Sequence, residues 1–278
     1  MSYLNYYNLD GKLFLESENN ISVNNRSFRY GDGFFETIKL IDGNIQLRIL
    51  HFLRITNSLI ELGFKSERHF TFDALHKQII ELATKNNHHK LGRIRITFFR
   101  ADAGLYEVEN FYPHILIQSF ELNETVNKLN ENGLLIDVYP LAKKSCDVFS
   151  NIKSNNYLQY AMAALWAKRN KLNDALLLNS NNNIADSTIA NVFIIKNNEI
   201  KTPALTEGCV AGVMRKHIIE TLKKQNIIVA ETTINIEDIT NADEVFLTNA
   251  IKGIMWVRQF RNSNYVNFET RKIYKQLF

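Results

Sequence analysis

The sequence predicts an α+β fold with mixed sheets, arranged as two domains. Its 278 residues and 45% apolar content suit two modest domains or one large one. Helical and extended patterns alternate along both halves, and the stretch 121–132 is polar, rich in Asn and Glu and without apolar periodicity. We therefore expect a first domain at 1–120, a linker at 121–132 and a second domain at 133–278.

The first half begins with a predicted β-hairpin. Residues Phe34 to Ile41 alternate toward Asp42-Gly43, a dipeptide typical of a two-residue hairpin turn, and the return strand follows from Ile45. Apolar residues then recur near helical spacing from Leu50 to Leu62, and Gly63 should end this helix.

A second predicted helix and two strands complete the first half. The helix covers about Asp73 to Lys85, with Asp73 as a plausible N-cap. The strands cover about Arg93–Phe99 and His114–Phe120.

The second half predicts more strands than helices. Asn179 to Asn183 reads as a turn between two of its elements. The expected strands are Leu134–Tyr139, Ala175–Leu178, Asn191–Lys196, Glu244–Thr248 and Ile254–Gln259, and the expected helices are Asn156–Lys171 and Gly212–Lys224.

The charge and hydropathy patterns exclude several classes of partner. The 33 basic and 29 acidic residues give a net charge of +4 without a long basic tract, so nucleic acid is not the natural partner. The longest apolar run, Ala161 to Ala167, is far shorter than the about 20 residues of a membrane span. Small anionic substrates and a phosphorylated cofactor would suit a local basic pocket.

The cysteines and the start of the chain indicate a cytosolic protein. Cys146 and Cys209 are far apart, without the spacing of a metal site, and the only adjacent histidines are His88 and His89. We expect a reducing compartment and no structural metal. The first eight residues contain neither a basic region nor an apolar run, so neither a secretory signal nor a transit peptide is indicated.

One segment predicts a phosphate site. Ala211-Gly212 precedes an amphipathic helix that opens with Val213-Met214-Arg215. A helix N-terminus preceded by small residues leaves backbone N–H groups available and exposes the positive end of the helix dipole, which suits a phosphate.

Four segments together carry a resemblance to a known family. They are Arg26-Ser27-Phe28-Arg29-Tyr30-Gly31-Asp32-Gly33-Phe34-Phe35-Glu36, His51-Phe52-Leu53-Arg54, Lys153-Ser154-Asn155-Asn156-Tyr157-Leu158, and the stretch from Asp186 through Asn191-Val192-Phe193 to Arg215. In this order, the chain resembles the class IV aminotransferases, a pyridoxal-phosphate family that includes branched-chain and D-amino acid aminotransferases and 4-amino-4-deoxychorismate lyase. The resemblance implies fold type IV, with a small α/β N-terminal domain and a larger, β-barrel-like C-terminal domain that carries the Schiff-base lysine.

The resemblance implies pyridoxal 5'-phosphate as cofactor and Lys153 as the lysine that binds it covalently. Such a lysine must reach the pocket deprotonated, through burial or cationic neighbours. Without the resemblance, a single lysine is usually a solvated surface residue.

Further cofactor residues follow from the resemblance alone. Asp186 stands where the family carries a glutamate that pairs with the pyridine nitrogen and keeps the ring an effective electron sink; the alternative is a turn cap. Arg54 would bind the phosphate through its planar guanidinium, or be a solvated helix residue. The backbone N–H groups of Val213 and Met214 would complete the phosphate cradle, with Asn249 and Ala250 nearby.

Four residues are candidates for the cofactor or substrate side of the pocket. Tyr157 could contact the cofactor, although a core tyrosine is as plausible. Arg100 matches an arginine that some members place near the substrate carboxylate; otherwise it is a strand-end surface residue. Phe35 and Thr37 share one strand face and could line the pocket, because side chains alternate along a strand.

The motifs resemble lyase members more than transaminases. Thr37, Gly31-Asp32-Gly33, the short Lys-x-x-Asn spacing and Gly-x-Met-Arg at the phosphate helix point to an aminodeoxychorismate-lyase-like enzyme of folate biosynthesis, with Lys153 and Thr37 as catalytic residues. The alternatives are a transaminase of branched-chain or D-amino acids that uses 2-oxoglutarate, and a weakly catalytic cofactor-binding protein. The resemblance also implies a homodimer.

Overall fold

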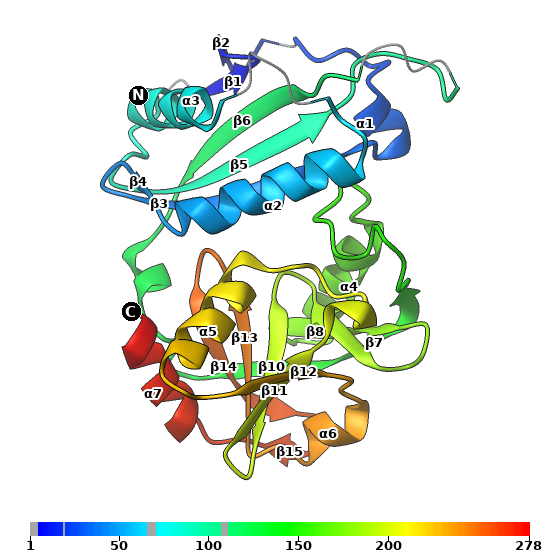
Figure 1. Ribbon diagram of the computed structural model, residues 1–278, viewed down its shortest axis with the longest axis vertical. Coiled ribbons are helices and arrows are strands. Elements are labelled where there is room, and N and C mark those ends of the chain that lie inside the picture. The colour runs from blue at the N-terminus through cyan, green and yellow to red at the C-terminus, as the bar shows by residue number, and fades with distance from the viewer. Residues whose placement is uncertain (1–4, 19, 66–70, 107–110) are drawn as a thin grey trace. The chain divides into compact units, whose positions relative to one another are not determined.

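The computed structural model describes residues 5–18, 20–65, 71–106 and 111–278. Residues 1–4, on which the expectation about the start of the chain partly rests, lie outside this set. The chain forms two compact units: unit 1 is Met1–Glu124 with Ile152–Asn156, and unit 2 is Thr125–Asn151 with Tyr157–Phe278. Each unit is described by itself below (Figure 1).

Unit 1 contains a six-stranded sheet in the order β2-β1-β6-β5-β3-β4, with every ladder antiparallel. Its helices α2 and α3 pack on one face, over a core that includes Ile38, Ile55, Ile79 and Ile94. The elements are β1 Tyr6–Leu9, β2 Lys12–Leu15, α1 Arg26–Tyr30, β3 Gly33–Ile41, β4 Asn44–Ile45, α2 Arg48–Glu61, α3 Phe72–Lys85, β5 Leu91–Phe99 and β6 His114–Glu121.

The predicted hairpin is confirmed. Asp42 and Gly43 join β3 to β4 with φ of 46° and 73°, and two consecutive positive φ angles are the mark of the type I′ turn that Asp-Gly favours. The turn therefore fixes the register of β3, the strand that carries Phe35 and Thr37.

The helices of unit 1 differ slightly from the prediction. The first begins at Arg48, two residues earlier than expected, and Gly63 follows it with φ of 65°. The second is capped by Thr71, whose side chain accepts from the Ala74 N–H, so the prediction of Asp73 as N-cap was wrong. Asp73 lies in the first turn instead, where its negative charge suits the helix dipole.

Unit 2 contains a nine-stranded mixed sheet in the order β12-β11-β10-β13-β14-β7-β8-β9, with β15 beside β14. Its core includes a cluster of buried side chains that contains Val192, Val245 and Val257, and another cluster beneath α4. The elements are β7 Leu134–Lys144, α4 Leu158–Arg169, β8 Asp174–Asn179, β9 Ile184–Ser187, β10 Asn191–Lys196, β11 Glu199–Pro203, η2 Leu205–Glu207, α5 Val213–Lys224, β12 Val229–Thr232, α6 Ile236–Thr240, β13 Glu244–Asn249, β14 Gly253–Phe260, β15 Ser263–Asn264 and α7 Phe268–Leu277.

The α+β fold is confirmed; the sheet of unit 2 is mixed as expected, whereas the sheet of unit 1 is entirely antiparallel. The unit boundary at Glu124 falls inside the expected linker, within the short helix η1 at Glu124–Asn127. One segment divides differently from the expectation: Ile152–Asn156 belongs to unit 1, although we expected Lys153 in the second domain. Within the described residues, no helix is long and apolar enough to cross a membrane.

Candidate active site

The backbone around Lys153 is attached to the start of β3. The Phe35 N–H donates to the Lys153 carbonyl at 2.9 Å, and the Asn155 N–H donates to the Gly33 carbonyl at 3.0 Å. Ser154 forms an antiparallel bridge with Phe34 between these two bonds. The segment is thus held by an isolated β-bridge and two flanking hydrogen bonds, which explains why it belongs to unit 1.

Two glycines make room for this attachment. A Cβ on Gly31 would lie 2.1 Å from Asn156 Oδ1, and one on Gly33 would lie 2.1 Å from the Phe98 carbonyl oxygen. Both have positive φ, 69° and 147°, a region in which side chains are strained. The motif Gly31-Asp32-Gly33 is therefore explained at both glycines by the approach of other chain segments.

Asp32, between the glycines, is held by two arginines. Arg26 Nε donates to one carboxylate oxygen at 2.7 Å, and Arg100 Nη1 donates to the other. Arg100 also donates to the Leu62 carbonyl and lies over the Phe64 ring. We expected Arg100 near a substrate carboxylate; the structure instead places its guanidinium on Asp32 and on backbone.

The Lys153 amine lies over an aromatic ring on the sheet. Its Nζ is 4.6 Å from the centroid of Phe35, and the guanidinium carbon of Arg95 is 3.8 Å from the same centroid. Thr37 shares this strand face, since it lies two residues further along β3, and it pairs directly with Arg95 on β5. Lys153, Phe35 and Thr37, which the sequence singled out, are thus brought to one face of unit 1.

This face carries a cluster of cations that sequence reasoning missed. Lys39 lies directly opposite Arg93, and Arg95 is the next residue on the same face of β5. None of the residues that β3, β5 and β6 place on this face is acidic. Like charges directly opposite on a sheet are destabilising, and burial lowers the pKa of Lys39 from its ordinary value. Strand alternation alone could have found this cluster.

Arg54 faces a buried carboxylate on the other side of β3. Its Nε donates to Glu36 Oε2 at 2.9 Å, and His51 Nδ1 lies 3.1 Å from Oε1. Burial alone would raise the pKa of Glu36, but the Arg54 and His51 charges outweigh it and hold that pKa well below its usual range. Glu36 therefore orients Arg54, the residue expected to bind the cofactor phosphate. The sequence alone did not predict this partner.

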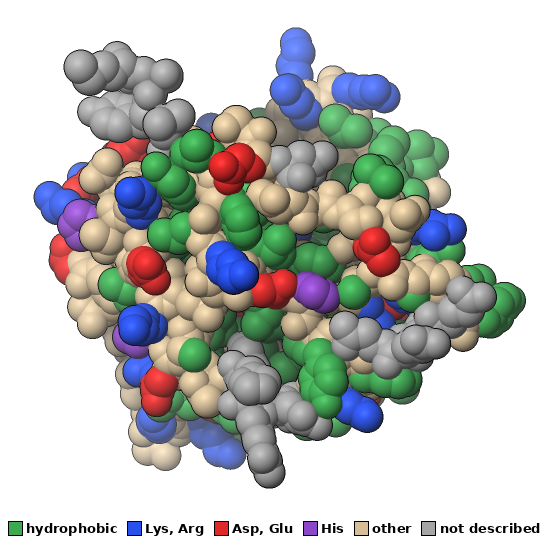
Figure 2. Space-filling model, turned by 90° about the horizontal axis from the view of Figure 1, so that it is seen from above, with side chains coloured by type: hydrophobic (Ala, Val, Ile, Leu, Met, Phe, Trp, Pro, Cys, Tyr) green, Lys and Arg blue, Asp and Glu red, His purple; other side chains and the backbone are tan. Residues whose placement is uncertain are grey.

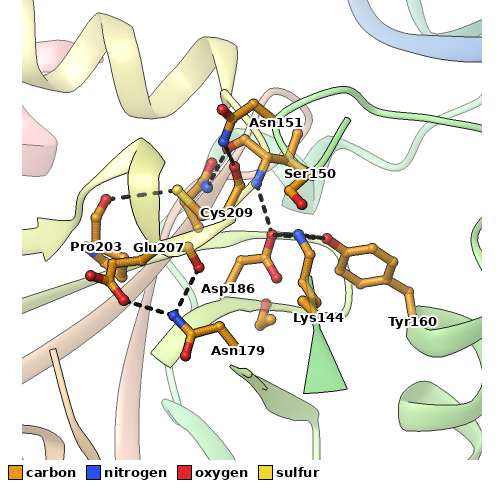
Figure 3. Close-up of polar contacts among 12 residues, drawn as sticks. Lys144, Ser150, Asn151, Tyr160, Asn179, Asp186, Pro203, Glu207 and Cys209 are labelled. Atoms are coloured by element: carbon orange, nitrogen blue, oxygen red, sulfur yellow. Dashed lines mark hydrogen bonds and ion pairs between the residues drawn. The ribbon is translucent and has the colours of Figure 1, made fainter. Parts of the chain in front are cut away.

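In unit 2, Asp186 is buried among three donors (Figure 3). Its Oδ2 accepts from Lys144 Nζ at 3.1 Å, from the Tyr160 hydroxyl at 2.9 Å and from the Val210 N–H at 3.0 Å. Its Oδ1 is buried without a hydrogen-bond partner among the described residues. An unpaired buried oxygen is costly, and a protonated ring nitrogen is the kind of donor it lacks.

Lys144 and Tyr160 were also missed by the sequence analysis. Lys143-Lys144 looks like an exposed basic pair, but Lys144 is 6% exposed. The β7 ladder with β8 has an irregularity between Val138 and Lys143, so the period of two cannot be extended across it. No local signal in the sequence reveals which lysine points inward.

Three hydrogen bonds with two asparagines hold the loop before α5. Asn151 donates through Nδ2 to the Cys209 carbonyl at 2.7 Å and accepts from the Ala211 N–H at 3.0 Å. Asn191 Nδ2 donates to the Val210 carbonyl at 2.8 Å, and a Cβ on Gly212 would lie 1.8 Å from Asn191 Oδ1. A larger residue at position 212 would therefore displace the Asn191 side chain that holds the loop.

The helix that follows this loop has a bare N-terminus. Gly212 is the N-cap of α5, and within the described part of the chain no side chain caps the first turn of Val213 and Met214. The first N–H groups of a helix have no partner within the helix. The loop and helix start thus form a rigid backbone cradle of the kind that suits a phosphate.

The remaining candidates in unit 2 have local partners. The Tyr157 hydroxyl donates to the Thr188 carbonyl at 2.9 Å, and its ring stacks on Tyr160 at 4.3 Å. Asn249 accepts through Oδ1 from the Ile251 and Lys252 N–H groups, so its side chain caps the turn after β13. Ala250 lies in that turn and is half-buried.

Comparisons with known proteins agree with these features. Residues 33–260 match the family described as amino-transferase class IV. The chain is 27% identical to a putative branched-chain-amino-acid aminotransferase of Methanocaldococcus jannaschii, over 97% of this chain and 92% of that one. It is 26% identical to an aminodeoxychorismate lyase of Vibrio harveyi, over 94% and 95%.

Solved structures show the same fold. A branched-chain aminotransferase from the archaeon Thermoproteus uzoniensis is similar with a TM-score of 0.87 at 23% identity, over 99% of this chain and 93% of that one. The orphaned Asp186 oxygen and the cradle before α5 fit the cofactor of the matched family, pyridoxal 5'-phosphate. The chain therefore belongs to the class IV aminotransferases, a family of pyridoxal-phosphate-dependent enzymes.

Proposed function

We propose that this enzyme is an aminodeoxychorismate lyase, which divides its substrate into pyruvate and 4-aminobenzoate for folate biosynthesis. The observation that carries the proposal is the face of unit 1 on which Lys153 lies over Phe35, beside Thr37 and the cations Lys39, Arg93 and Arg95. Aminodeoxychorismate carries two carboxylates. The positive charges of this cluster complement them, because opposite charges offset the repulsion within the cluster.

Pyridoxal phosphate would supply the electron sink that stabilises a developing carbanion. Lys153 would hold the cofactor and later take the proton from the ring carbon that bears the substrate amine. The bond from the neighbouring ring carbon to the enolpyruvyl oxygen then breaks, and the leaving enolpyruvate gains a proton and becomes pyruvate. All substrate atoms pass into the two products, so no oxidant is needed. We assign Thr37 as the second catalytic residue, which would relay a proton.

We assign the remaining cofactor contacts as follows. Asp186 accepts from the ring nitrogen through its unpaired Oδ1. Arg54 and the backbone of Val213 and Met214 bind the phosphate, and Glu36 orients Arg54. The other proposed contacts are Tyr157, Asn249 and Ala250 with the cofactor, and Phe35 and Arg100 with the substrate.

Transamination with 2-oxoglutarate is the second candidate, of the branched-chain or D-amino acid type. The 27% identity to a putative branched-chain aminotransferase favours it. Because 2-oxoglutarate is also a dicarboxylate, the same cations would bind it. The third candidate is a binder of the cofactor with weak catalysis, against which the arrangement of Lys153 argues.

A side-by-side assay on one cofactor-loaded sample separates the three. The lyase releases pyruvate from aminodeoxychorismate, whereas a transaminase shifts the cofactor absorbance on addition of an amino donor and transfers the amine to 2-oxoglutarate. No change with any amine would identify a binder. Lys153→Ala is the control, and it should abolish either activity.

The setting that we propose is a homodimer in the cytoplasm, with small amino compounds as partners. On the face drawn in Figure 2, basic and acidic side chains are interspersed, as on an ordinary protein surface. Sedimentation of the purified protein tests the dimer.

A further inference from the structure

The buried cation beside Asp186 has no assigned role. Lys144 and Asp186 are 6% and 2% exposed, and they form an ion pair at 3.1 Å (Figure 3). Burying two charges is costly, and replacing such a pair by apolar residues is often neutral or stabilising. Fold stability is therefore a weak reason for a lysine here, and we looked for an effect on Asp186 itself.

The three donors on Asp186 all bind the same oxygen. Lys144, Tyr160 and the Val210 N–H bind Oδ2, whereas Oδ1 has no partner among the residues that the structure describes. Lys144 also donates to the Tyr160 hydroxyl, which in turn donates to Asp186. The mutual hydrogen bonds of these three side chains fix the plane of the Asp186 carboxylate. Its Oδ2 therefore binds protein donors, and its Oδ1 can accept from a ligand.

Other titratable groups surround Asp186, and most are neutral or paired. Burial raises the pKa of Tyr160 well above its ordinary value and raises that of Cys209 to about 11, so both stay protonated at neutral pH. Arg215 is paired with Glu231 at 2.6 Å. The charged or titratable groups that face this site are Lys144 from β7, Tyr160 from α4, Tyr157 at the N-cap of α4, Cys209 from the loop before α5 and Arg215 from α5.

We propose that Lys144 is a positioning residue that sets the proton affinity of the ring nitrogen bound by Asp186. This inference rests on the proposed binding of pyridoxal phosphate. A carboxylate alone would strongly retain a proton on the nitrogen, whereas a cation on its second oxygen offsets part of that attraction. The nitrogen should then lose its proton at a pH where the enzyme is still folded.

A lower proton affinity of the ring nitrogen suits the lyase reaction better than transamination. Elimination from aminodeoxychorismate is driven by formation of an aromatic ring, so it needs less stabilisation of negative charge from the cofactor. The shorter Asp186, where the family resemblance implies glutamate, and its Lys144 partner would act in the same direction.

The test follows the ring nitrogen directly. Pyridoxal phosphate labelled with ¹⁵N at that atom is bound to the enzyme, and its NMR chemical shift is recorded against pH. In Lys144→Met, the nitrogen should keep its proton to a pH higher by about 1–3 units, the usual effect of one nearby charge. Tyr160→Phe removes one hydrogen bond without changing charge, and it should shift the titration much less.

Each outcome bears on the inference. It is overturned if Lys144→Met titrates at the wild-type pH, or if the wild-type nitrogen stays protonated wherever the protein is folded. If Lys144→Met does not fold, as judged by circular dichroism, Lys144→Gln removes the charge but keeps a donor, and it should show the same upward shift. Wild-type protein that binds no cofactor would overturn the proposed function as well, whereas bound cofactor with unchanged titration overturns this inference alone.

Discussion

Lys153 and Asp186 are held in place by different means. Lys153 is positioned through its backbone, by two hydrogen bonds to β3 and by glycines that allow other segments to approach. Asp186 is positioned through its side chain, by a buried cation, a hydroxyl and one N–H. A lysine that must bind, release and accept protons needs a mobile side chain on a fixed backbone, whereas a carboxylate that pairs with one atom needs a fixed side chain.

The two sites should therefore respond to different kinds of substitution. The Lys153 segment should fail when backbone space is removed, and the Asp186 site should fail when its charge balance is removed.

The largest expected effect is on charge balance in unit 2. Asp186→Asn leaves Lys144 buried beside a neutral group, and it should lower the free energy of unfolding of the apoprotein by about 3–5 kcal/mol. Lys144→Met in the same chain removes the unpaired cation, so the double variant should recover most of that loss. Urea denaturation at neutral pH measures both. A double variant no more stable than Asp186→Asn would show that charge is not what holds this site.

The next effect is on backbone space in unit 1. A Cβ on Gly33 would overlap the Phe98 carbonyl oxygen, so Gly33→Ala should cost about 3 kcal/mol or more from overpacking and strain. Gly43→Ala is the matched control, because Gly43 also has positive φ but has nothing within 4 Å of its Cβ position. It should cost about 1 kcal/mol. Thermal melting measures the loss of stability in the two variants. Equal losses would show that the close approach of the Phe98 carbonyl does not contribute to the cost at Gly33.

A pH effect should come from Glu36. Its pKa is held below the ordinary 4.5 in the folded protein, so its stabilising contribution is present above about pH 4.5 and is lost as the pH falls through the folded value. The loss should be on the order of 2 kcal/mol. Glu36→Gln lacks this group, so its stability should fall less between neutral and acidic pH. If the stability of wild type and variant falls equally between neutral and acidic pH, Glu36 is not the group responsible for the loss.

The smallest effect leaves the fold unchanged. Cys209 lies in the loop next to Asp186, is 1% exposed and has its pKa raised to about 11 by burial, whereas Cys146 is exposed. Under native conditions a thiol reagent should label Cys146 rapidly and Cys209 far more slowly. In denaturant the two should react at similar rates. Equal labelling in the native protein would mean that the loop before α5 is open.

Local patterns in the sequence predicted much of the fold. The Asp42-Gly43 turn, the strand Asn191–Lys196 and the helix that ends at Lys224 lie where they were expected, because each depends on neighbours in the chain. The attachment of Lys153 to β3 could not be predicted, since its partners are distant in sequence. Periodicity along Phe34–Ile41 did place Phe35 and Thr37 on one face.

The site was predicted less completely, because its charged side chains pair with residues that are distant in the sequence. Sequence spacing placed Arg100 at a strand end, but it did not reveal the contacts of Arg100 with Asp32 and the Leu62 carbonyl. Lys144 was overlooked because the irregular β7 ladder hides its inward direction. Both depend on side-chain directions that are set by tertiary packing rather than by sequence spacing.

The choice of lysine is the central claim, and Lys144 is the natural competitor. The cofactor-loaded enzyme is treated with sodium borohydride, which fixes pyridoxal phosphate to the lysine that holds it, and the digested protein is mapped by mass spectrometry. The pyridoxyl group should lie on Lys153 and should be absent after Lys153→Ala. A label on Lys144, or no label on either lysine, would show that Lys153 does not hold the cofactor.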